Sequence, residues 1–365
     1  MKNIDFSGSY LKSDVIFLLK VIEIETSNIE RKESEIQSGR KHYSEMISPE
    51  YRPSKEYLDI FYKSLEQNMD QFAQDILNFA FNIPKNSVLV SLARAGTPIG
   101  VLLKRIIKDR RKLDIPHFSI SIIRDRGVDM NALKYIQEKY PTKDIFFIDG
   151  WTGKGVIGKE LKKSVEEYNL EYGTDILPHL SVLSDISGKA EYSVSKQDYM
   201  IPSSALNSTI SGLVSRTVLN IKYIGKDDFH GCKFYSEFRD YDLSLWFVDK
   251  VVERTKKLKP DKSGFLKRDL EKEKICEEYI DQLMKKWSIS NINFIKPGIA
   301  ETTRVLLRRV PERVILKDIQ SDDVKHLIQL AKEKNVTINE LKNLPYSAVG
   351  IIKNVNKEKN NGKII

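Results

Sequence analysis

The pattern of apolar and polar positions predicts strands that alternate with helices over the first 250 residues. Apolar runs at 87–92, 145–148 and 180–183, and an isoleucine-rich run at 117–123, are typical of strands buried in a parallel sheet. Between 55 and 81, apolar residues recur every three or four positions, which indicates amphipathic helices. Strands alternating with helices predict an α/β domain with a doubly wound parallel sheet.

The pattern changes after residue 252. Residues 253–274 are dominated by Lys, Arg, Asp and Glu, which predicts a charged linker, and 275–287 continues as a helix. Short apolar runs predict strands at 304–307, 314–316 and 349–352, with a helix over 324–334. We therefore predict a first domain over 1–252, a charged linker and helix over 253–289, a smaller α/β sandwich over 290–353 and a disordered tail over 354–365.

The stretch that follows the 145–148 strand is typical of a phosphate site. Asp149 stands at the strand end, and Thr152, Gly153, Lys154 and Gly155 directly precede an amphipathic helix. Free backbone N–H groups and the positive end of a helix dipole favour a phosphate at such a place. The loop is not a Walker A loop, because a glycine stands where a Ser or Thr should follow the lysine.

Two further strands end in residues suited to anions. The 87–92 strand is followed by Arg94, a glycine and Thr97, which is placed to cap a helix that has a proline at its first position. The 117–123 strand is followed by Arg124 and Arg126. Because ligands bind beyond the carboxyl ends of the strands in such sheets, we expect these loops to lie close together.

Composition limits the classes of protein. The 365 residues include 60 Lys and Arg against 51 Asp and Glu, and this net charge of +9 suits anionic ligands such as phosphates or RNA. The chain has two cysteines, which fit a reducing compartment and exclude a disulfide scaffold or a four-cysteine zinc site. The apolar run 15–22 is too short for a signal peptide, and no later run approaches a membrane span, so we expect a cytoplasmic protein without a membrane partner.

Five separated blocks together resemble one bacterial family. In order they are SLARAGTPIGVLLKR, SISIIRDRGVD, FFIDGWTGKG, LNSTISGLVSRTV and DDFHG. This set is similar to the StiP family, a phosphoribosyltransferase-like group associated with tellurite-resistance and stress operons, some of whose members are labelled cysteine proteases. The resemblance implies the fold of type I phosphoribosyltransferases.

The same resemblance implies a site for phosphoribosyl pyrophosphate, or a related nucleotide, with Mg²⁺. Asp149 would face the ribose hydroxyls or a metal-bound water, Thr152 to Gly155 would hold the 5-phosphate, and Arg124 and Arg126 would neutralise the leaving pyrophosphate. The loop has one acid where such loops usually have two adjacent acids. The substrate-binding candidates are Arg94, Ala95, Gly96, Thr97, Gly150, Trp151, Thr152, Gly153, Lys154, Gly155, Asn207, Ser208 and Arg216.

The C-terminal part is similar to the Pelota-type RNA-binding domain. The similarity rests on INFIKPGIAETTRVLLRRVPERVIL and on HLIQLAKEKNVTINELKNLPYSAVGIIKNV. It implies a small α/β/α sandwich that contacts structured RNA through a loop, a basic helix and an apolar loop. The RNA-binding candidates are Lys296, Gly298, Thr302, Arg304, Arg308 and Arg309.

Two alternatives remain open at this stage. A cysteine protease would use Cys232, but side chains two residues apart, such as His230 and Cys232, do not readily meet as a catalytic pair, so a more distant histidine would be required. A cysteine in such a segment is more often a small buried residue. The other alternative is an RNA-binding protein whose first domain senses a nucleotide without turnover.

Overall fold

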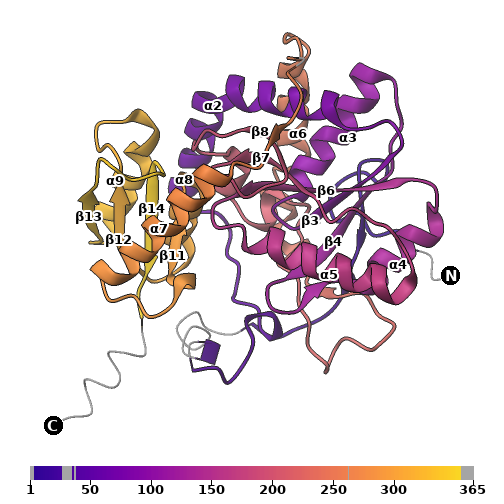
Figure 1. Cartoon of the computed structure of the whole chain (residues 1–365), viewed down its shortest axis with the longest axis horizontal. Helices are drawn as coiled ribbons and strands as arrows, with labels where there is room; N and C mark the ends of the chain where they lie inside the picture. The colour runs from indigo at the N-terminus through magenta and orange to yellow at the C-terminus, as the bar shows by residue number, and fades with distance from the viewer. Residues whose placement is uncertain (1–3, 27–34, 37, 262, 355–365) are drawn as a thin grey trace.

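The computed structural model describes residues 4–26, 35–36, 38–261 and 263–354. A large N-terminal domain and a smaller C-terminal domain lie side by side (Figure 1). No helix among these residues is long and apolar enough to cross a membrane. The tail predicted to be disordered lies, except for Asn354, outside the described residues.

The large domain is built on a sheet of eight strands in the described part of the chain. Its order is β1-β4-β3-β6-β7-β8-β10, with β5 paired to β4; β5 and β10 run antiparallel to their neighbours and the other pairs are parallel. A two-stranded ladder joins β2 to β9. The strands are β1 (Ile16–Leu18), β2 (Lys20–Val21), β3 (Ser87–Ala93), β4 (His117–Ile123), β5 (Gly127–Val128), β6 (Asp144–Thr152), β7 (Leu180–Asp185), β8 (Tyr192–Ser195), β9 (Gly231–Cys232) and β10 (Leu266–Lys267).

Helices cover both faces of this sheet (Figure 1). On one face α2 (Lys55–Asn82), α3 (Thr97–Arg111) and α6 (Ser244–Thr255) pack together, and on the other lie α4 (Met130–Lys139) and α5 (Val156–Tyr172). Alternate residues of β3 enter different cores: Leu89 packs with α2 and α3, whereas Val88 and Val90 pack with α4 and α5. Period-two alternation in an all-apolar strand therefore builds two cores from one run.

The strand order creates a crevice at one edge of the sheet. The chain passes from β3 to β4 on one side and then crosses back to β6 on the other side of β3. In doubly wound sheets ligands bind at such a switch point, beyond the carboxyl ends of the strands. The predicted mixed α/β architecture with a mainly parallel sheet is confirmed, and the loops after β3 and β6 flank the switch point.

The small domain is a sheet with helices on both faces. Its strand order is β11 (Ile295–Pro297), β14 (Ala348–Ile352), β12 (Pro311–Leu316) and β13 (Thr337–Glu340). Helices α8 (Ile299–Arg308) and α9 (Lys325–Glu333) cover one face, and α7 (Leu270–Lys286) covers the other. Short 3₁₀ turns occur at Tyr43–Glu45, Pro202–Ser204, Ser208–Ile210, Ser236–Tyr241, Ile292–Phe294 and Asp322–Val324.

The structure differs from the sequence prediction at two places in this part of the chain. The predicted strand at 304–307 is wrong, because these residues belong to α8 and place Val305 and Leu306 on its buried face. A short apolar run does not by itself distinguish a strand from one side of a helix. The charged stretch after 252 also contributes a strand, since β10 pairs with β8 at the edge of the large sheet.

The two domains share one continuous core and a buried polar link. Ile299 and Leu306 of α8 belong to the same apolar cluster as Ile201 of the large domain. Asp198, which follows β8, accepts hydrogen bonds from Ile299 N and Ser347 N, both at 2.8 Å. Because Ile299 begins α8, this carboxylate caps the helix from the other domain and fixes its orientation.

We expect Asp198→Asn to loosen this domain contact. An amide keeps the shape but turns one acceptor into a donor facing a backbone N–H, so the free energy of unfolding should fall by about 1–3 kcal/mol. Chemical denaturation of the full chain measures this change. Asp281→Asn, on the exposed side of α7, is the matched control and should have no measurable effect; equal stability of both variants would contradict the role of Asp198.

Candidate functional site

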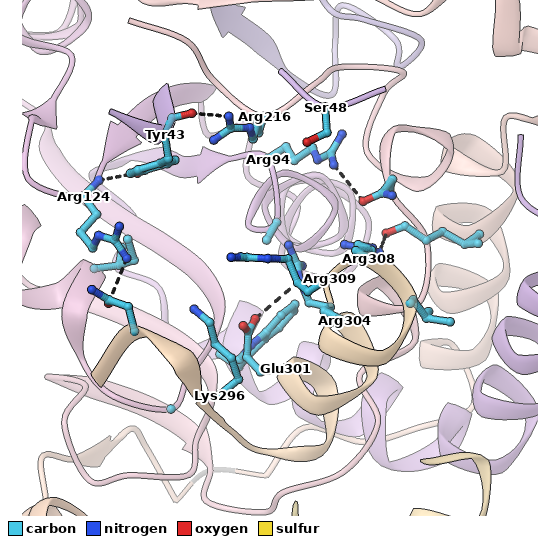
Figure 2. Close-up of a pocket in the computed structure, with 18 of the residues that line it drawn as sticks. Tyr43, Ser48, Arg94, Arg124, Arg216, Lys296, Glu301, Arg304, Arg308 and Arg309 are labelled. Carbon is cyan, nitrogen blue, oxygen red and sulfur yellow. Dashed lines mark hydrogen bonds and ion pairs between the residues drawn. The ribbon is translucent and has the colours of Figure 1, made fainter. Parts of the chain in front are cut away.

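A cavity of about 1190 Å³ lies between the domains at the carboxyl edge of the large sheet. Its walls include the ends of β3, β4 and β6 from one domain, and β11 and α8 from the other. Figure 2 shows basic side chains of both domains around one common space. Among the described residues nine basic side chains and three carboxylates line it: Arg52, Arg94, Arg124, Lys154, Arg216, Lys296, Arg304, Arg308 and Arg309, with Glu50, Asp149 and Glu301.

The loop after β6 opens helix α5 as the sequence indicates. The strand continues through Thr152, whose Oγ1 accepts a hydrogen bond from Gly155 N at 3.1 Å. Gly155 has a φ of 71°, a conformation that favours glycine, and α5 begins at the next residue. Gly153 is required for a different reason, because a Cβ there would lie 2.9 Å from the carbonyl oxygen of Pro297 in the other domain.

Asp149 lies on the cavity wall beside this loop. Its Oδ1 accepts a hydrogen bond from Gly150 N at 2.8 Å. Burial raises the pKa of Asp149 to about 7, although the positive charge of Arg304 acts to lower it. The Arg304 guanidinium lies over the Trp151 ring, 5.7 Å from its centroid. A carboxyl group with this pKa is able to accept or release a proton near neutral pH.

Two lysines face the cavity near the loop. Lys154 Nζ donates to the carbonyl oxygen of Ile292 at 2.6 Å, and no ion pair of either Lys154 or Lys296 is present among the described residues. Burial and the neighbouring charge of Lys296 together lower the pKa of Lys154 to about 7. Burial likewise lowers the pKa of Lys296 to about 8. For both lysines burial outweighs the negative charge of Glu301, which acts to raise their pKa values.

Arg94 is held by a network on the opposite wall. It forms an ion pair with Glu50 and donates to Asn207 Oδ1 at 2.9 Å and to Val214 O at 2.9 Å. Glu50 also accepts from Ser208 N at 3.1 Å. The network explains why Asn207 and Ser208, distant in sequence, lie beside Arg94.

Tyr43 lies between two arginines at the cavity wall. The guanidinium of Arg124 is 5.0 Å from the centroid of its ring, and that of Arg216 is 5.2 Å away. The Tyr43 hydroxyl accepts from Arg124 N at 2.7 Å, and its carbonyl oxygen accepts from Arg216. Burial lowers the pKa of Arg216 to about 10. Cation–π contacts with one ring help to hold the two positive charges in place.

Helix α8 presents three arginines to the same cavity. Arg304 pairs with Glu301 at 3.6 Å, and Arg308 donates to the carbonyl oxygens of Ser204 and Leu206 at 3.1 and 2.7 Å. Burial lowers the pKa of Arg308 well below its usual range. Figure 2 shows Arg304, Arg308 and Arg309 on the side of the cavity formed by the small domain. Four of the six residues proposed for RNA, Lys296, Arg304, Arg308 and Arg309, therefore line the same cavity as the candidate phosphate loop.

Several sequence candidates lie outside the cavity lining within the described residues. Thr97 is buried, with its hydroxyl 2.7 Å from Ser119 Oγ, and Arg126 is half-exposed and pairs with Glu45 at 3.5 Å. Thr302 is buried in α8, and Gly298 precedes that helix with a φ of 97°. A Cβ at Gly96 would lie 2.8 Å from Ile148 O, whereas Gly150, inside β6, has only ordinary van der Waals contacts. The roles proposed for these residues stay predictions, and their positions favour structural ones.

Candidates lining the cavity come from five separate stretches. They are Arg94, Ala95, Arg124, Asp149, Trp151, Thr152, Gly153, Lys154, Gly155, Asn207, Ser208, Arg216, Lys296, Arg304, Arg308 and Arg309. Sequence reasoning did not find Glu50, which lies in an irregular segment with no motif. Tyr43 was also not among the candidates. A polar cluster around Gly39, close to Tyr43 in the sequence, was the signal that could have identified Tyr43.

Neither cysteine lies at this cavity. Cys232 in β9 is fully buried, and burial raises the pKa of its thiol. The ring of nearby His230 lies 2.8 Å from Ser121 Oγ through its Nδ1 atom. Cys276 in α7 is buried in the core of the small domain, where burial raises the pKa of that thiol too. A buried thiol with a raised pKa is a poor nucleophile.

Comparison with known proteins gives consistent matches over both domains. The family described as "Tellurite-like stress resistance cysteine protease StiP" matches residues 8–252, and the family described as "PELOTA RNA binding domain" matches residues 274–354. The chain is 38% identical over 371 residues to "Cysteine protease StiP" of Acinetobacter baylyi, which covers 96% of this chain and 95% of that protein.

A solved structure of a pyridoxal-phosphate-bound C–S lyase from Staphylococcus hominis also aligns with the chain. It covers 89% of this chain and 84% of its own at 11% identity, with a TM-score of 0.24. A likeness this low carries no argument about fold or function.

Proposed function

Because the chain belongs to the StiP family and ends in a Pelota-like RNA-binding domain, we propose that it binds a phosphorylated ribose or nucleotide in the interdomain cavity. The observation that carries this proposal is the concentration of nine basic side chains, against three carboxylates, at the switch point of a parallel sheet, counted over the described residues. Such a site favours anions.

In this proposal the ligand is phosphoribosyl pyrophosphate with Mg²⁺, and a ribosyl-phosphate group is transferred or cleaved. Lys154 and the N–H groups at the start of α5 would bind the 5-phosphate. Asp149, an oxygen donor of the kind Mg²⁺ prefers, would contact the ribose hydroxyls or a metal-bound water. Mg²⁺ would neutralise charge on the departing pyrophosphate, which the arginines of the cavity would hold in place.

A cysteine protease is the second candidate, and the names of the family and of the Acinetobacter protein favour it over phosphoribosyl transfer. The nucleophile would be Cys232. A cysteine protease requires an accessible thiolate beside an imidazole, whereas this thiol is fully buried and its pKa is raised. Proteolysis by Cys232 would thus require a rearrangement that exposes β9.

The Pelota match supports binding of structured RNA as a second property of the chain. The basic candidates of α8 line a cavity and not an open face. An RNA would therefore reach them with an unpaired loop or end, the parts of RNA most often recognised by proteins.

We expect isothermal titration calorimetry of the full chain to show binding of phosphoribosyl pyrophosphate in the presence of Mg²⁺. Asp149→Asn removes a charged acceptor worth about 1.5–3 kcal/mol, so affinity should fall about tenfold to a hundredfold. Lys163→Met, on the exposed side of α5, is the control and should bind as the wild type does. The phosphoribosyl hypothesis fails if the wild type binds nothing or if Asp149→Asn binds equally well.

Replacement of Cys232 by Ala tests the protease hypothesis. Because a small buried thiol and a methyl group have similar shapes, we expect phosphoribosyl pyrophosphate affinity and thermal stability to change little. Cleavage of a casein or mixed-peptide substrate is assayed with both proteins. A proteolytic activity in the wild type that disappears in folded Cys232→Ala would establish the protease and contradict a structural role for this thiol.

The RNA hypothesis is tested by filter binding of an RNA hairpin with an internal bulge to the full chain. Retention should weaken as salt rises, because phosphate contacts release counterions. Arg304→Ala should weaken it further, whereas Lys332→Ala, on exposed α9, should not. Salt-independent retention, or equal retention by the two variants, would argue against binding through α8.

A further inference from the structure

The candidate phosphate loop is in direct contact with the small domain. Lys154 donates to the carbonyl oxygen of Ile292, and the Tyr346 hydroxyl donates to Gly153 O at 3.3 Å. Pro297 lies so close to Gly153 that no side chain fits between them. A ligand seated at this loop would therefore meet both domains.

One basic group of the cavity is shared between the domains at the loop. Lys154 comes from the loop before α5 and Lys296 from β11, and the charge of Lys296 lowers the pKa of Lys154. The charge of Arg124 acts on both lysines. Neither lysine forms an ion pair in the described part of the chain, although the charge of Glu301 acts on both, so the group combines three cations with one nearby carboxylate and suits a phosphate.

A second basic group lies across the cavity. Figure 2 shows Arg94 and Arg216 on the opposite side from Lys296. Arg308 and Arg309 of the small domain act electrostatically on this group: the charge of Arg94 reaches Arg308, and the charge of Arg309 reaches Arg216. Glu50 balances Arg94 by an ion pair, and the four arginines of this group, which is also shared between the domains, still outnumber that one carboxylate.

The region between the two groups is closer to neutral. Glu301 forms an ion pair with Arg304 there, and Asp149 lies near both, so its charge is also partly balanced. The side chain of Trp151 adds an apolar surface covered by Arg304. The hydroxyl groups and the ring of a bound ligand would suit this middle region better than a third phosphate group of that ligand.

We propose that the small domain forms half of the ligand site, and that the ligand is a sugar phosphate with phosphate groups at two ends, each end contacted by both domains. This deepens the proposed function and rests on it. The basic residues of β11 and α8 then serve a small ligand that holds the domains together. At about 1190 Å³ the cavity is large enough for such a ligand, since pockets for small molecules commonly span about 300–1,000 Å³.

Calorimetry on full-length variants tests this arrangement with two probes. Phosphoribosyl pyrophosphate with Mg²⁺ has phosphates at both ends of the sugar, and ribose 5-phosphate has one. We expect Lys296→Ala to weaken both probes about tenfold or more, because it removes a charge at the loop end. Arg309→Ala should weaken the two-ended probe by a similar factor and ribose 5-phosphate by less.

Three comparisons make the outcome decisive. Lys332→Ala removes an exposed lysine of the small domain and should leave both affinities within about twofold, a change of less than about 0.5 kcal/mol. Thermal unfolding confirms that each variant is folded. If the wild type binds and Asp149→Asn weakens binding while Lys296→Ala and Arg309→Ala do not, the ligand is held by the large domain alone, and the proposed function survives without this inference. Absence of wild-type binding overturns both.

Discussion

The position of helix α8 depends on one buried carboxylate. Asp198 belongs to the large domain, yet it accepts hydrogen bonds from the first N–H group of α8 and from Ser347 N beside β14. Gly298, with its φ of 97°, lets the chain turn into the helix directly above this carboxylate. Because α8 carries Arg304 and Arg308, the same link directs the basic face of the small domain toward the phosphate loop of the large one.

The cavity concentrates like charges that are costly to keep together without an anion. Burial lowers the pKa values of Lys154, Lys296 and Arg216, and neighbouring cations lower them further. The protein limits this cost by pairing Arg94 with Glu50 and by placing Tyr43 between two guanidinium groups. A bound phosphate would add negative charge beside cations of both domains, so in the proposed arrangement ligand binding would favour domain docking.

The family name and the geometry of this chain direct attention to different residues. The name points to a cysteine, but both thiols are buried in cores, where a small soft side chain packs well. The cavity instead gathers arginines, lysines and one carboxyl group whose pKa is near neutral. Chemistry at this cavity would therefore involve anions and proton transfer at Asp149, and thiol chemistry would need a different conformation.

The sequence alone determined the four parallel strands β3, β4, β6 and β7 and the loop that opens α5. Local signals suffice there, because an apolar run, Gly155 and the α5 pattern each act within a few residues. The sequence could not place α8, whose apolar positions also fit a short strand, nor reveal that Glu50 would pair with Arg94. Only tertiary structure decided that the small domain closes the interdomain cavity. That closure depends on Asp198 meeting a helix N-terminus a hundred residues later, a contact with no periodicity or motif.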